Sequence, residues 1–398
     1  MLSLAEARAT IEKLVLPLDS ATVALSSARG RILRQDIHAP EDLPAFDRSA
    51  MDGYVVDAVD PSERFRVKFE VQAGQTPSGR IERGECARIF TGAPIPEGAS
   101  QVIMQEDVVR DGEWITVRER DTRAWIRRRG EDARRGDLLL AAGPRLRAGE
   151  LSLLAQIGAT EVQVGPAPRV LHFATGDELV DPSATPGAGQ IRDSNSTLIA
   201  ALLAEMGAHL VTQHRCGDAL EPLVAEIQRH PTATWDVLLI SGGASVGDYD
   251  FGRRALAELG FTVHFPNIRI RPGKPLVFAT RGRQVAFVIP GNPMSHFVTF
   301  QIGVRHALER LEGAPSSWAL AKIELAADLP AKSNDRETLW PVHVAASDGV
   351  LRAHPLAWQS SGDLRGLLGA NGLLPIAPGA SGAKKGTPVD CLLLGSVS

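Results

Sequence analysis

Cysteine is scarce in this sequence, and its scarcity excludes two kinds of architecture. The 398-residue chain has three cysteines, Cys86, Cys216 and Cys391, which are far apart and lack the spacing of a metal site. A disulfide-stapled scaffold needs more cysteines than this, and a zinc site needs them in closely spaced pairs. We therefore expect buried, reduced thiols in a protein of the cytoplasm.

Long apolar runs are absent as well. The first 20 residues, MLSLAEARATIEKLVLPLDS, carry Glu6, Arg8, Glu12 and Lys13 inside their apolar pattern, which indicates an amphipathic helix and not a signal peptide. No apolar stretch is long enough to cross a bilayer. The sequence therefore predicts a soluble, cytoplasmic protein without a membrane partner.

An excess of charge of either sign is the third absence. The formal net charge is -4, and 23% of the residues are charged. The one basic run, Arg127 to Arg129, is bracketed by acidic residues in WIRRRGEDARRGD. Because nucleic-acid binding usually requires a basic excess on one face, we expect no nucleic-acid partner.

The apolar pattern divides the chain into several domains, as its length requires. Short alternating runs parted by Gly and Pro, such as FRVKFEVQAG and EWITVRER, predict an antiparallel β module between two helical segments, which reads as an insertion. We expect a helical domain at 1–45 and 131–166, an inserted β domain at 46–130, an α/β domain at 167–313 and a C-terminal β domain at 314–398.

The α/β domain is predicted from alternating strands and helices. The strand-like runs VLHFAT, HLVTQHRC, WDVLLIS and QVAFVIP alternate with amphipathic runs such as STLIAALLAEMGA. This alternation predicts a parallel sheet covered on both faces. Ligands of such sheets bind beyond the carboxyl ends of the strands, which directs attention to the loops there.

Polar loops follow several of these strands. They are TGDEL, SGGASVGDYD and PGNPMS, and IRPGKP lies between the last two. Each loop alone is more often structural: PGNP is a common turn, and Asp177 could cap a helix. Their conjunction at one predicted edge favours a binding site.

Glycines and hydroxyls in the SGGASVGDYD loop predict an anion cradle. Gly242, Gly243 and Gly247 can adopt positive φ and let a ligand approach the main chain, while Ser241 and Ser245 add hydroxyls. Carboxylates lie in or near the same loops, where they would repel a phosphate. A divalent cation bound between carboxylate and phosphate oxygens would remove this repulsion. We therefore expect a phosphate or pyrophosphate with Mg²⁺, and phosphoryl or nucleotidyl transfer or hydrolysis. The carboxylates are Asp177, Glu178, Asp193, Asp218 and Asp250, and the cation Lys274 lies at the same predicted edge.

Nucleophilic catalysis finds little support. None of these loops contains a cysteine, and the chain has no G-x-S-x-G elbow. We interpret His296, beside Ser295, as a packing or surface residue.

Eight motifs in one order carry a family resemblance. The sequence resembles the bacterial molybdopterin molybdenumtransferases, relatives of the E domain of gephyrin, over essentially its full length. The motifs are PAFDRSAMDGYVV (44–56), FTGAPIPEGASQVIMQED (90–107), IRRRGED (126–132), ATGDELV (174–180), DSNS (193–196), SGGASVGDYD (241–250), RPGKP (271–275) and PGNPMS (290–295).

The resemblance implies a fold, an assembly and a reaction. It implies the domain organisation given above, with a barrel-like C-terminal domain, and a homodimer whose active site lies between subunits. The implied reaction inserts molybdenum from molybdate into the dithiolene of adenylylated molybdopterin, with Mg²⁺ and release of AMP. Transient contacts with the molybdopterin adenylyltransferase and with apo-molybdoenzymes are implied as well.

The resemblance also implies residue roles. Asp218 and Asp250 would hold Mg²⁺, Glu178, Asp132 and Asp52 are acidic positions that the family needs, and Thr91 would come from the partner subunit. The substrate would further contact Asp177, Gly242, Gly243, Ser245, Gly247, Arg271 and Asn292, and molybdate would bind at Lys274, Ser295, Arg336 and Ser361.

Plain alternatives exist for several of these residues. Asp132 could pair with the nearby arginines, Arg336 could be a surface charge, and Asp52 and Thr91 could be turn residues. The chain also departs from the family pattern, because Arg271 and Asn267 stand where lysines are usual. Arginine keeps the charge but changes the donor geometry.

Two other functions compete with the transferase. A scaffold or storage protein would keep the fold and lose the chemistry, but scaffolding does not require Glu178, Asp218 or Lys274. A molybdopterin adenylyltransferase or a pyrophosphate-cleaving enzyme would share the α/β domain, but the inserted and C-terminal β domains argue against both.

Overall fold

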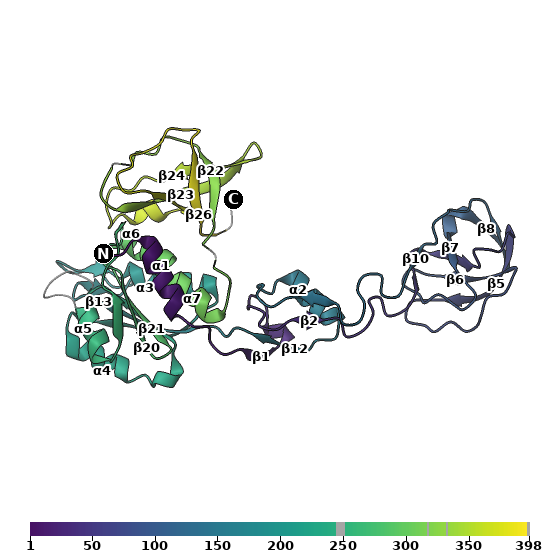
Figure 1. The fold of residues 1–398 in the computed structure, drawn as a ribbon, viewed down its shortest axis with the longest axis horizontal. Coiled ribbons are helices and arrows are strands. Elements are labelled where there is room, and N and C mark those ends of the chain that lie inside the picture. Colours follow the sequence, from purple (N-terminus) through teal and green to yellow (C-terminus); the bar gives the residue numbers. More distant parts are fainter. Residues whose placement is uncertain (244–250, 317, 332, 396–398) are drawn as a thin grey trace. The chain divides into compact units, whose positions relative to one another are not determined.

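A computed structural model describes residues 1–243, 251–316, 318–331 and 333–395 (Figure 1). The chain forms two compact units, which we describe separately. Unit 1 comprises Met1–Arg34, Gly143–Arg147 and Glu161–Ser398, and unit 2 comprises Gln35–Ala142 and Ala148–Thr160. Within the described ranges, no helix combines the length and apolar character that a membrane crossing requires. The four domain boundaries expected from the sequence stay a prediction.

The centre of unit 1 is a six-stranded sheet in the order β16-β13-β17-β21-β20-β18. All residues of β17 are buried, and they alternate between two cores: Val237 and Leu239 face one, Leu238 and Ile240 the other. This alternation is what a strand covered on both faces requires. The strands are β13 (Arg169–Thr175), β16 (His209–Cys216), β17 (Val237–Ser241), β18 (Thr262–Phe265), β20 (Val277–Arg281) and β21 (Gln284–Ile289).

The sheet is mixed and not wholly parallel. The four strands β16, β13, β17 and β21 pair in parallel, as the sequence predicts. In contrast, β20 pairs antiparallel with both β21 and β18. A tight turn around Gly282, whose φ is 58°, joins β20 to β21, and so short a connection allows only antiparallel pairing.

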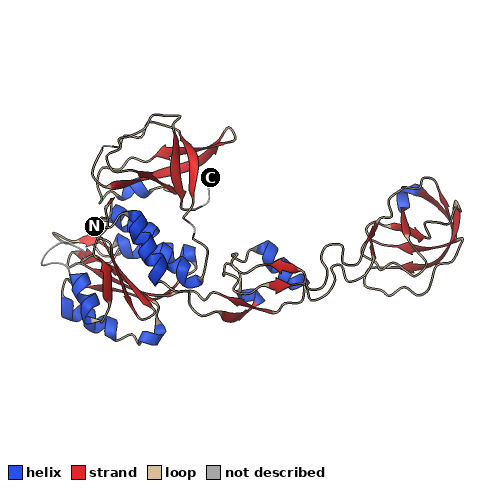
Figure 2. Cartoon of the chain, in the orientation of Figure 1, coloured by secondary structure: helices blue, strands red, loops and turns tan. Residues whose placement is uncertain are grey.

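Helices cover both faces of the sheet (Figure 2). A capping box between Ser3 and Glu6 starts α1, Asp193 caps α3, and Gly207 and Gly313 end α3 and α7 in the left-handed conformation. One core takes α1 (Leu4–Leu14), α3 (Ser194–Met206), α6 (Pro293–Thr299), the π-helix η4 (Phe300–Val304) and α7 (Arg305–Glu312); the other takes α4 (Leu220–Gln228) and α5 (Phe251–Glu258).

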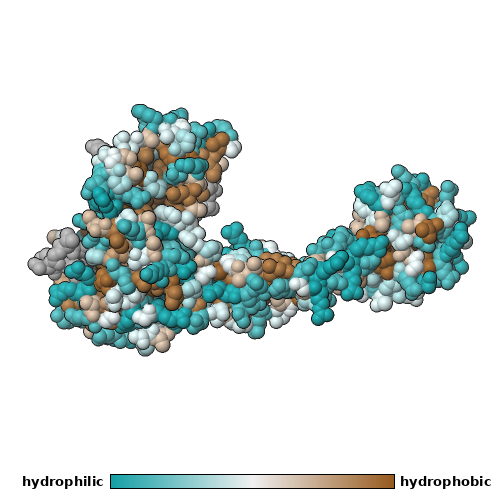
Figure 3. All heavy atoms as spheres, viewed as in Figure 1, coloured by the Kyte–Doolittle hydropathy of each residue, from teal (hydrophilic) through white to brown (hydrophobic). Residues whose placement is uncertain are grey.

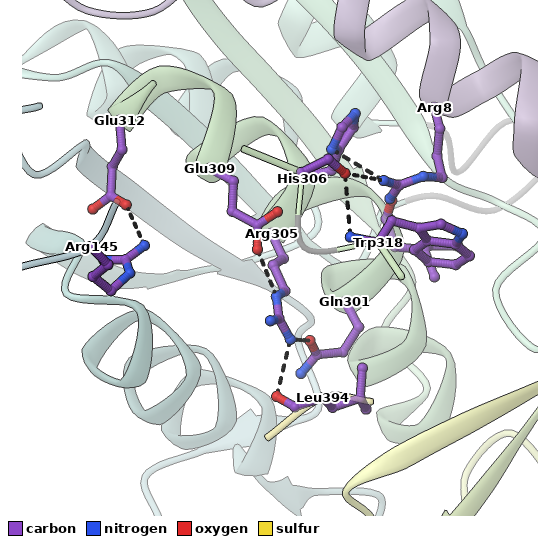
Figure 4. Close-up of polar contacts among 11 residues, drawn as sticks. Arg8, Arg145, Gln301, Arg305, His306, Glu309, Glu312, Trp318 and Leu394 are labelled. Atoms are coloured by element: carbon purple, nitrogen blue, oxygen red, sulfur yellow. Dashed lines mark hydrogen bonds and ion pairs between the residues drawn. The ribbon is translucent and has the colours of Figure 1, made fainter. Parts of the chain in front are cut away.

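Polar contacts on α7 tie distant segments of unit 1 together (Figure 4). Arg305 pairs with Glu309 at 3.0 Å and donates to the carbonyl oxygen of Leu394 at 3.1 Å. Glu312 pairs with Arg145 at 2.9 Å. The guanidinium carbon of Arg8 lies 4.1 Å from the ring centre of Trp318. These contacts connect the sheet domain with the last strand, the 143–147 segment and the opening helix.

The C-terminal β domain is a closed barrel of five strands in the order β23-β24-β22-β26-β25, because β25 pairs back with β23. Leu339, Leu373 and Leu392 belong to the same buried cluster as α6, so the barrel packs on the α/β domain. Apolar residues are visible near β22 and β26 in Figure 3. The strands are β22 (Leu320–Leu325), β23 (Glu337–Ser347), β24 (Val350–Pro355), β25 (Gly372–Ile376) and β26 (Pro388–Leu393), and β19 (Ile270–Arg271) adds to β23.

Short elements complete unit 1. Unit 1 also contains two two-stranded sheets. One pairs segments far apart along the chain, and the other pairs segments that are close along it. They are β1 (Ala21–Ala24) with β12 (Glu161–Val164), and β14 (Leu179–Val180) with β15 (Ile191–Arg192); the 3₁₀ turns are η1 (Leu25–Ser27), η3 (Thr232–Thr234) and η5 (Leu364–Leu367).

Unit 2 is built on a six-stranded sheet in the order β7-β4-β6-β5-β9-β8. It is antiparallel as predicted, with one exception: β5 and β6 pair in parallel. Its strands are β4 (Gly53–Val56), β5 (Arg64–Val71), β6 (Glu85–Ile89), β7 (Gln101–Met104), β8 (Val108–Asp111) and β9 (Trp114–Val117); the small elements are β2 (Ile37–His38), β3 (Arg48–Ser49), β10 (Ile126–Arg127), β11 (Leu138–Leu140), η2 (Gln105–Asp107) and α2 (Ala148–Gln156).

The three thiols are free in the structure. Cys86 and Cys391 are buried, and burial raises the pKa of each to about 12. Cys216 is half-buried. The expectation of buried thiols is confirmed for the first two.

Candidate functional site

A pocket of about 650 Å³ opens at the carboxyl edge of the sheet in unit 1. Four parallel strands end there in register, because Thr175 pairs with Cys216, and Ser241 pairs with Ile289. We call it the edge pocket. Its lining includes Thr175, Gly176, Glu178, Asp193, Asn195, Asp218, Ser241, Gly242, Gly243, Pro275, Gly291, Asn292, Gly362 and Leu364.

Carboxylates gather on one side of the edge pocket. Glu178 and Asp218 line it, and Oδ1 of Asp177 accepts a hydrogen bond from the backbone amide of Asp218 at 3.1 Å. Burial, followed by the neighbouring charges of Glu178 and Asp177, raises the pKa of Asp218. Gly176 has a φ of 153°, a backbone conformation that residues with a Cβ rarely adopt, so the turn favours glycine there.

Asp177 therefore caps no helix, whereas Asp193 does. Asp193 accepts from the amide and hydroxyl of Ser196 at the start of α3. The cap explains this buried carboxylate by structure alone.

The carboxylate group suits a cation better than it suits an anion. Charge repulsion between Asp218 and its two acidic neighbours is relieved when a cation binds. In the described part of the chain, no cluster of three or more His, Cys, Asp and Glu residues has the geometry of a metal centre. Mg²⁺ does not require such a cluster, since it is often held by one or two carboxylates and by phosphate oxygens. The residues present therefore fit Mg²⁺.

Gly242 and Gly243 also line the edge pocket, and the amide of Gly242 donates to the carbonyl oxygen of Ile289 at 3.0 Å. Gly242 and Gly243 have φ angles of 93° and 60°, in the left-handed region. A Cβ at Gly242 would lie 2.6 Å from the carbonyl oxygen of Thr175, so the close approach of the two strand ends also requires glycine. Ser245, Gly247 and Asp250 lie outside the described residues.

Two buried histidines, His172 and His296, contact residues that line the edge pocket. No sequence motif indicated His172. Nε2 of His172 lies 2.6 Å from the hydroxyl oxygen of Ser241, and the side-chain amide of Gln213 donates to Nδ1 at 2.8 Å. With Nδ1 accepting, Nε2 carries the proton and donates to Ser241. Burial lowers the pKa of His172 to about 3, so it is neutral at pH 7.

His296 is the second buried histidine. It is fully buried and its Nδ1 donates to the carbonyl oxygen of Pro290 at 2.9 Å, so the packing interpretation holds and the surface interpretation is wrong. Burial lowers its pKa to about 4. A histidine in an apolar helix gives no sequence signal that separates this role from ordinary packing.

The 270–275 segment carries two cations, Arg271 and Lys274, and its Pro275 lines the edge pocket. This segment precedes β20, whose first residue, Val277, pairs with Val288 near the end of β21, so it meets the same edge. Arg271 and Lys274 are half-buried. Neither side chain forms a hydrogen bond or ion pair with any residue that the structure describes. Two such cations on one short segment favour an anionic ligand.

Ser295, Arg336 and Ser361 come from three further segments that meet the 270–275 segment or each other. The backbone amide of Met294 donates to the carbonyl oxygen of Ser361 at 3.0 Å, which joins the start of α6 to the barrel. Arg336 donates to the carbonyl oxygen of Ile270 at 3.4 Å. Ser295 is buried in the first turn of α6. Asn292 precedes that helix and lines the edge pocket.

Asp52 and Thr91 contact each other in unit 2. One carboxylate oxygen of Asp52 accepts both from the amide and from the hydroxyl of Thr91, each at 2.7 Å. The amide contact, followed by the hydroxyl contact, lowers the pKa of Asp52. The two motifs that contain them, SAMDGY and FTGAP, are therefore linked directly.

Asp132 pairs with Arg127, as the plain alternative anticipated. The other arginines of the basic run are also paired, Arg128 with Asp47 at 2.7 Å and Arg129 with Asp42 at 2.6 Å. Acidic residues of unit 2 thus neutralise the run locally.

Three family models match successive parts of the chain. The MoeA N-terminal region (domain I and II) matches residues 2–158, a probable molybdopterin binding domain matches residues 172–310, and the MoeA C-terminal region (domain IV) matches residues 322–394.

Relatives of known name match along nearly the whole length. The chain is 33% identical over 399 residues to a molybdopterin molybdenumtransferase of Nostoc sp., covering 96% of this chain and 91% of the relative. It is 33% identical over 386 residues to the molybdopterin molybdenumtransferase of Bacillus subtilis, covering 94% and 89%. A crystal structure of a molybdopterin biosynthesis MoeA protein from Pyrococcus horikoshii matches with a TM-score of 0.82 at 28% identity, covering 99% of this chain and 100% of that one. The chain therefore belongs to the molybdopterin molybdenumtransferase family.

Proposed function

We propose that this chain is an enzyme of molybdenum cofactor biosynthesis that transfers molybdenum to molybdopterin. One observation supports the proposal above all: glycine amides, carboxylates and the cation-bearing 270–275 segment meet at a single edge of the sheet. Those groups suit a substrate with a phosphate chain and a second, oxyanionic reactant. The names of the family relatives agree with this reaction.

The substrate is adenylylated molybdopterin, and AMP is released. The edge pocket, at about 650 Å³, has the size of an ordinary ligand site. The amide of Gly243 would donate to a pyrophosphate oxygen, while the amide of Gly242 donates to the carbonyl oxygen of Ile289 at 3.0 Å and, with Ser241 held by His172, keeps the wall in position. Asp177 and Asn292 would orient the substrate at the two ends of this wall.

Mg²⁺ would be held by Asp218, together with Asp250, with Glu178 beside them. Bound there, the ion supplies charge neutralisation at the phosphate oxygens. Burial, followed by the like charges of Glu178 and Asp177, raises the pKa of Asp218, and a bound cation would offset both effects, which supports this role.

Molybdate would bind at Lys274, Ser295, Arg336 and Ser361. Two cations and two hydroxyls provide charge and hydrogen-bond donors for a tetrahedral dianion. The contact between Met294 and Ser361 supports the grouping, because it keeps the two serine-bearing segments adjacent.

The active assembly would be a homodimer of the cytoplasm, in which Asp52, Thr91 and Asp132 of one subunit complete the site of the other. The bond between Asp52 and Thr91 supports a shared role for these two residues. The four domains keep the boundaries given above. The molybdopterin adenylyltransferase would supply the substrate, and apo-molybdoenzymes would receive the product.

Release of AMP from adenylylated molybdopterin, measured with and without molybdate, tests this proposal. Wild type should release AMP in a molybdate-dependent reaction that needs Mg²⁺. Lys274→Gln should slow it at least tenfold, whereas Lys322→Gln, which removes an exposed lysine of the barrel, should not. Binding without cleavage would favour the scaffold or storage reading, and conversion of molybdopterin and ATP to the adenylylated compound would favour the adenylyltransferase.

A further inference from the structure

A second, smaller pocket in unit 1 is not explained by the roles assigned so far. It has a volume of about 360 Å³ and lies between the 270–275 segment and the C-terminal barrel. We call it the indole pocket. It is lined by Arg271, Pro330, Ala331, Thr338, Trp340, Ala357, Trp358 and Gln359.

Two tryptophans form a rigid corner of the indole pocket. The rings of Trp340 and Trp358 meet edge to face, with centres 5.5 Å apart and planes at 72°. Nε1 of Trp340 donates to the carbonyl oxygen of Leu356 at 3.0 Å, which fixes its ring. Aromatic side chains held in this way bind planar rings with little loss of conformational freedom.

Arg271 adds a cation to this corner. Its guanidinium carbon lies 5.7 Å from the centre of the Trp358 ring, and it has no hydrogen-bond or ion-pair partner in the described part of the chain. A planar guanidinium next to an indole can stack and donate hydrogen bonds in its own plane. The corner therefore suits a flat heterocycle that carries carbonyl and ring-nitrogen acceptors.

The indole pocket and the edge pocket are connected by two chain segments. The first runs from Arg271, in the indole pocket, to Pro275, in the edge pocket. The second runs from Gln359, in the indole pocket, to Gly362, in the edge pocket. Lys274 and Ser361, two of the proposed molybdate ligands, lie between the ends of these segments in sequence. The anion site thus falls between the two pockets.

We propose that the indole pocket binds the pterin ring of molybdopterin, while the AMP portion lies in the edge pocket. The inference rests on the proposed function. In adenylylated molybdopterin the dithiolene lies between the pterin and the phosphates, so this placement brings it to the proposed molybdate residues. The reverse placement, with adenine in the indole pocket, would put the dithiolene away from them. At about 360 Å³ the pocket is near the small end of ligand sites, which suits one bicyclic ring.

A pterin site in the indole pocket would explain why this chain has arginine at position 271, where lysine is usual in the family. Lysine at this position supplies charge but cannot stack on an indole as a planar group. Arginine pairs with Trp358 and extends the surface against which a ring can lie. Arg271→Lys should therefore weaken pterin binding several-fold even though the charge is kept.

Equilibrium binding of two probes, free 6-hydroxymethylpterin and AMP with Mg²⁺, tests the assignment on the full-length protein. Trp358→Ala should weaken pterin binding roughly 5- to 150-fold, the range of a lost base-stacking contact, and leave AMP binding unchanged. Asp218→Asn should weaken the Mg²⁺-dependent binding of AMP and leave pterin binding unchanged. Trp114→Ala is the matched control, because Trp114 is an exposed indole of unit 2.

Three results would overturn the assignment: no pterin binding by wild type, unchanged pterin binding in Trp358→Ala, or a loss of AMP binding in that variant, which would mean that adenine occupies the pocket. Trp358→Phe, which keeps a ring, and Arg271→Lys give the same test if the alanine variant does not fold. Molybdenum transfer by wild type is measured in parallel. Pterin binding without transfer would count against the proposed function alone, and transfer without a Trp358 effect against this inference alone.

Discussion

Nε2 of His172 lies 2.6 Å from the hydroxyl oxygen of Ser241, and this contact supports the wall of the edge pocket. His172→Phe removes the donor to the buried Ser241 hydroxyl and one of two acceptors of the Gln213 amide, which keeps the carbonyl oxygen of Ser196. We expect a loss of about 1–3 kcal/mol in the free energy of unfolding, which is the cost of buried polar groups without partners. We also expect slower AMP release, because Ser241 would no longer be fixed. Urea denaturation and the AMP assay measure the two effects. His209→Phe, an exposed histidine of β16, is the control, and equal losses in both variants would contradict this role.

The buried histidines predict a loss of stability in mild acid. The pKa values of His172 and His296 are about 3 and about 4, below the usual value of 6.5. Between pH 6.5 and about 4 the unfolded chain therefore binds protons that the folded chain does not, and stability falls as the pH falls. The loss is on the order of 2–3 kcal/mol for each histidine over this range. Melting temperatures measured from pH 7 to 4.5 should fall, and His296→Gln should reduce the slope. A variant with an unchanged slope would contradict this interpretation.

The pair between Arg305 and Glu309 should contribute strongly to the stability of unit 1 (Figure 4). Arg305→Met removes the ion-pair partner of Glu309, which is 5% exposed and keeps another contact. Removing one partner of a fully buried pair costs about 3–5 kcal/mol and an exposed pair contributes under about 1 kcal/mol, so we expect a loss between these values. Arg283→Met, which breaks an exposed pair with Asp19, is the matched control. Chemical denaturation compares the two variants, and similar losses would show that the buried pair has no special weight.

The hydroxyl of Thr91 should matter for activity more than for folding. Thr91→Val removes the hydrogen bond to Asp52 and keeps the volume, while the backbone amide still donates to the same oxygen. We expect about a 1 kcal/mol loss of stability, typical of one hydrogen bond, and at least a tenfold drop in AMP release. Thr91→Ser, which keeps the hydroxyl, should restore most of the rate. If Thr91→Val is as active as wild type, Thr91 acts only as a turn residue.

Much of the fold could be predicted from the sequence because local patterns determine it. The continuous apolar run in WDVLLIS became β17 with its two buried faces, and the helical runs between strands became α3, α4 and α5. Strand partners are a different matter. The parallel pairing of β5 with β6 depends on contacts between segments that no local pattern records. Likewise, the antiparallel pairing of β20 with β21 follows from the tight turn at Gly282. This turn can be interpreted only when the segments on both sides of it are known to be strands.

The candidate site shows the same division. The glycines at 176, 242 and 243 were visible in sequence, and all three have a positive φ that residues with a Cβ rarely adopt. His172 was not, since a histidine within an apolar strand looks like any core residue. The indole pocket was not visible either. Its corner joins Arg271, Trp340 and Trp358, residues that are far apart along the chain and carry no shared motif.

Formation of active molybdenum cofactor tests the account most directly. The purified protein would be incubated with adenylylated molybdopterin, Mg²⁺ and molybdate, and the product scored by rescue of an apo-molybdoenzyme while AMP is quantified in the same mixture. We expect rescue that requires molybdate and rises in step with AMP release, and a loss of both in Lys274→Gln. Rescue that is equally fast without this protein, or in the Lys274→Gln variant, would contradict it.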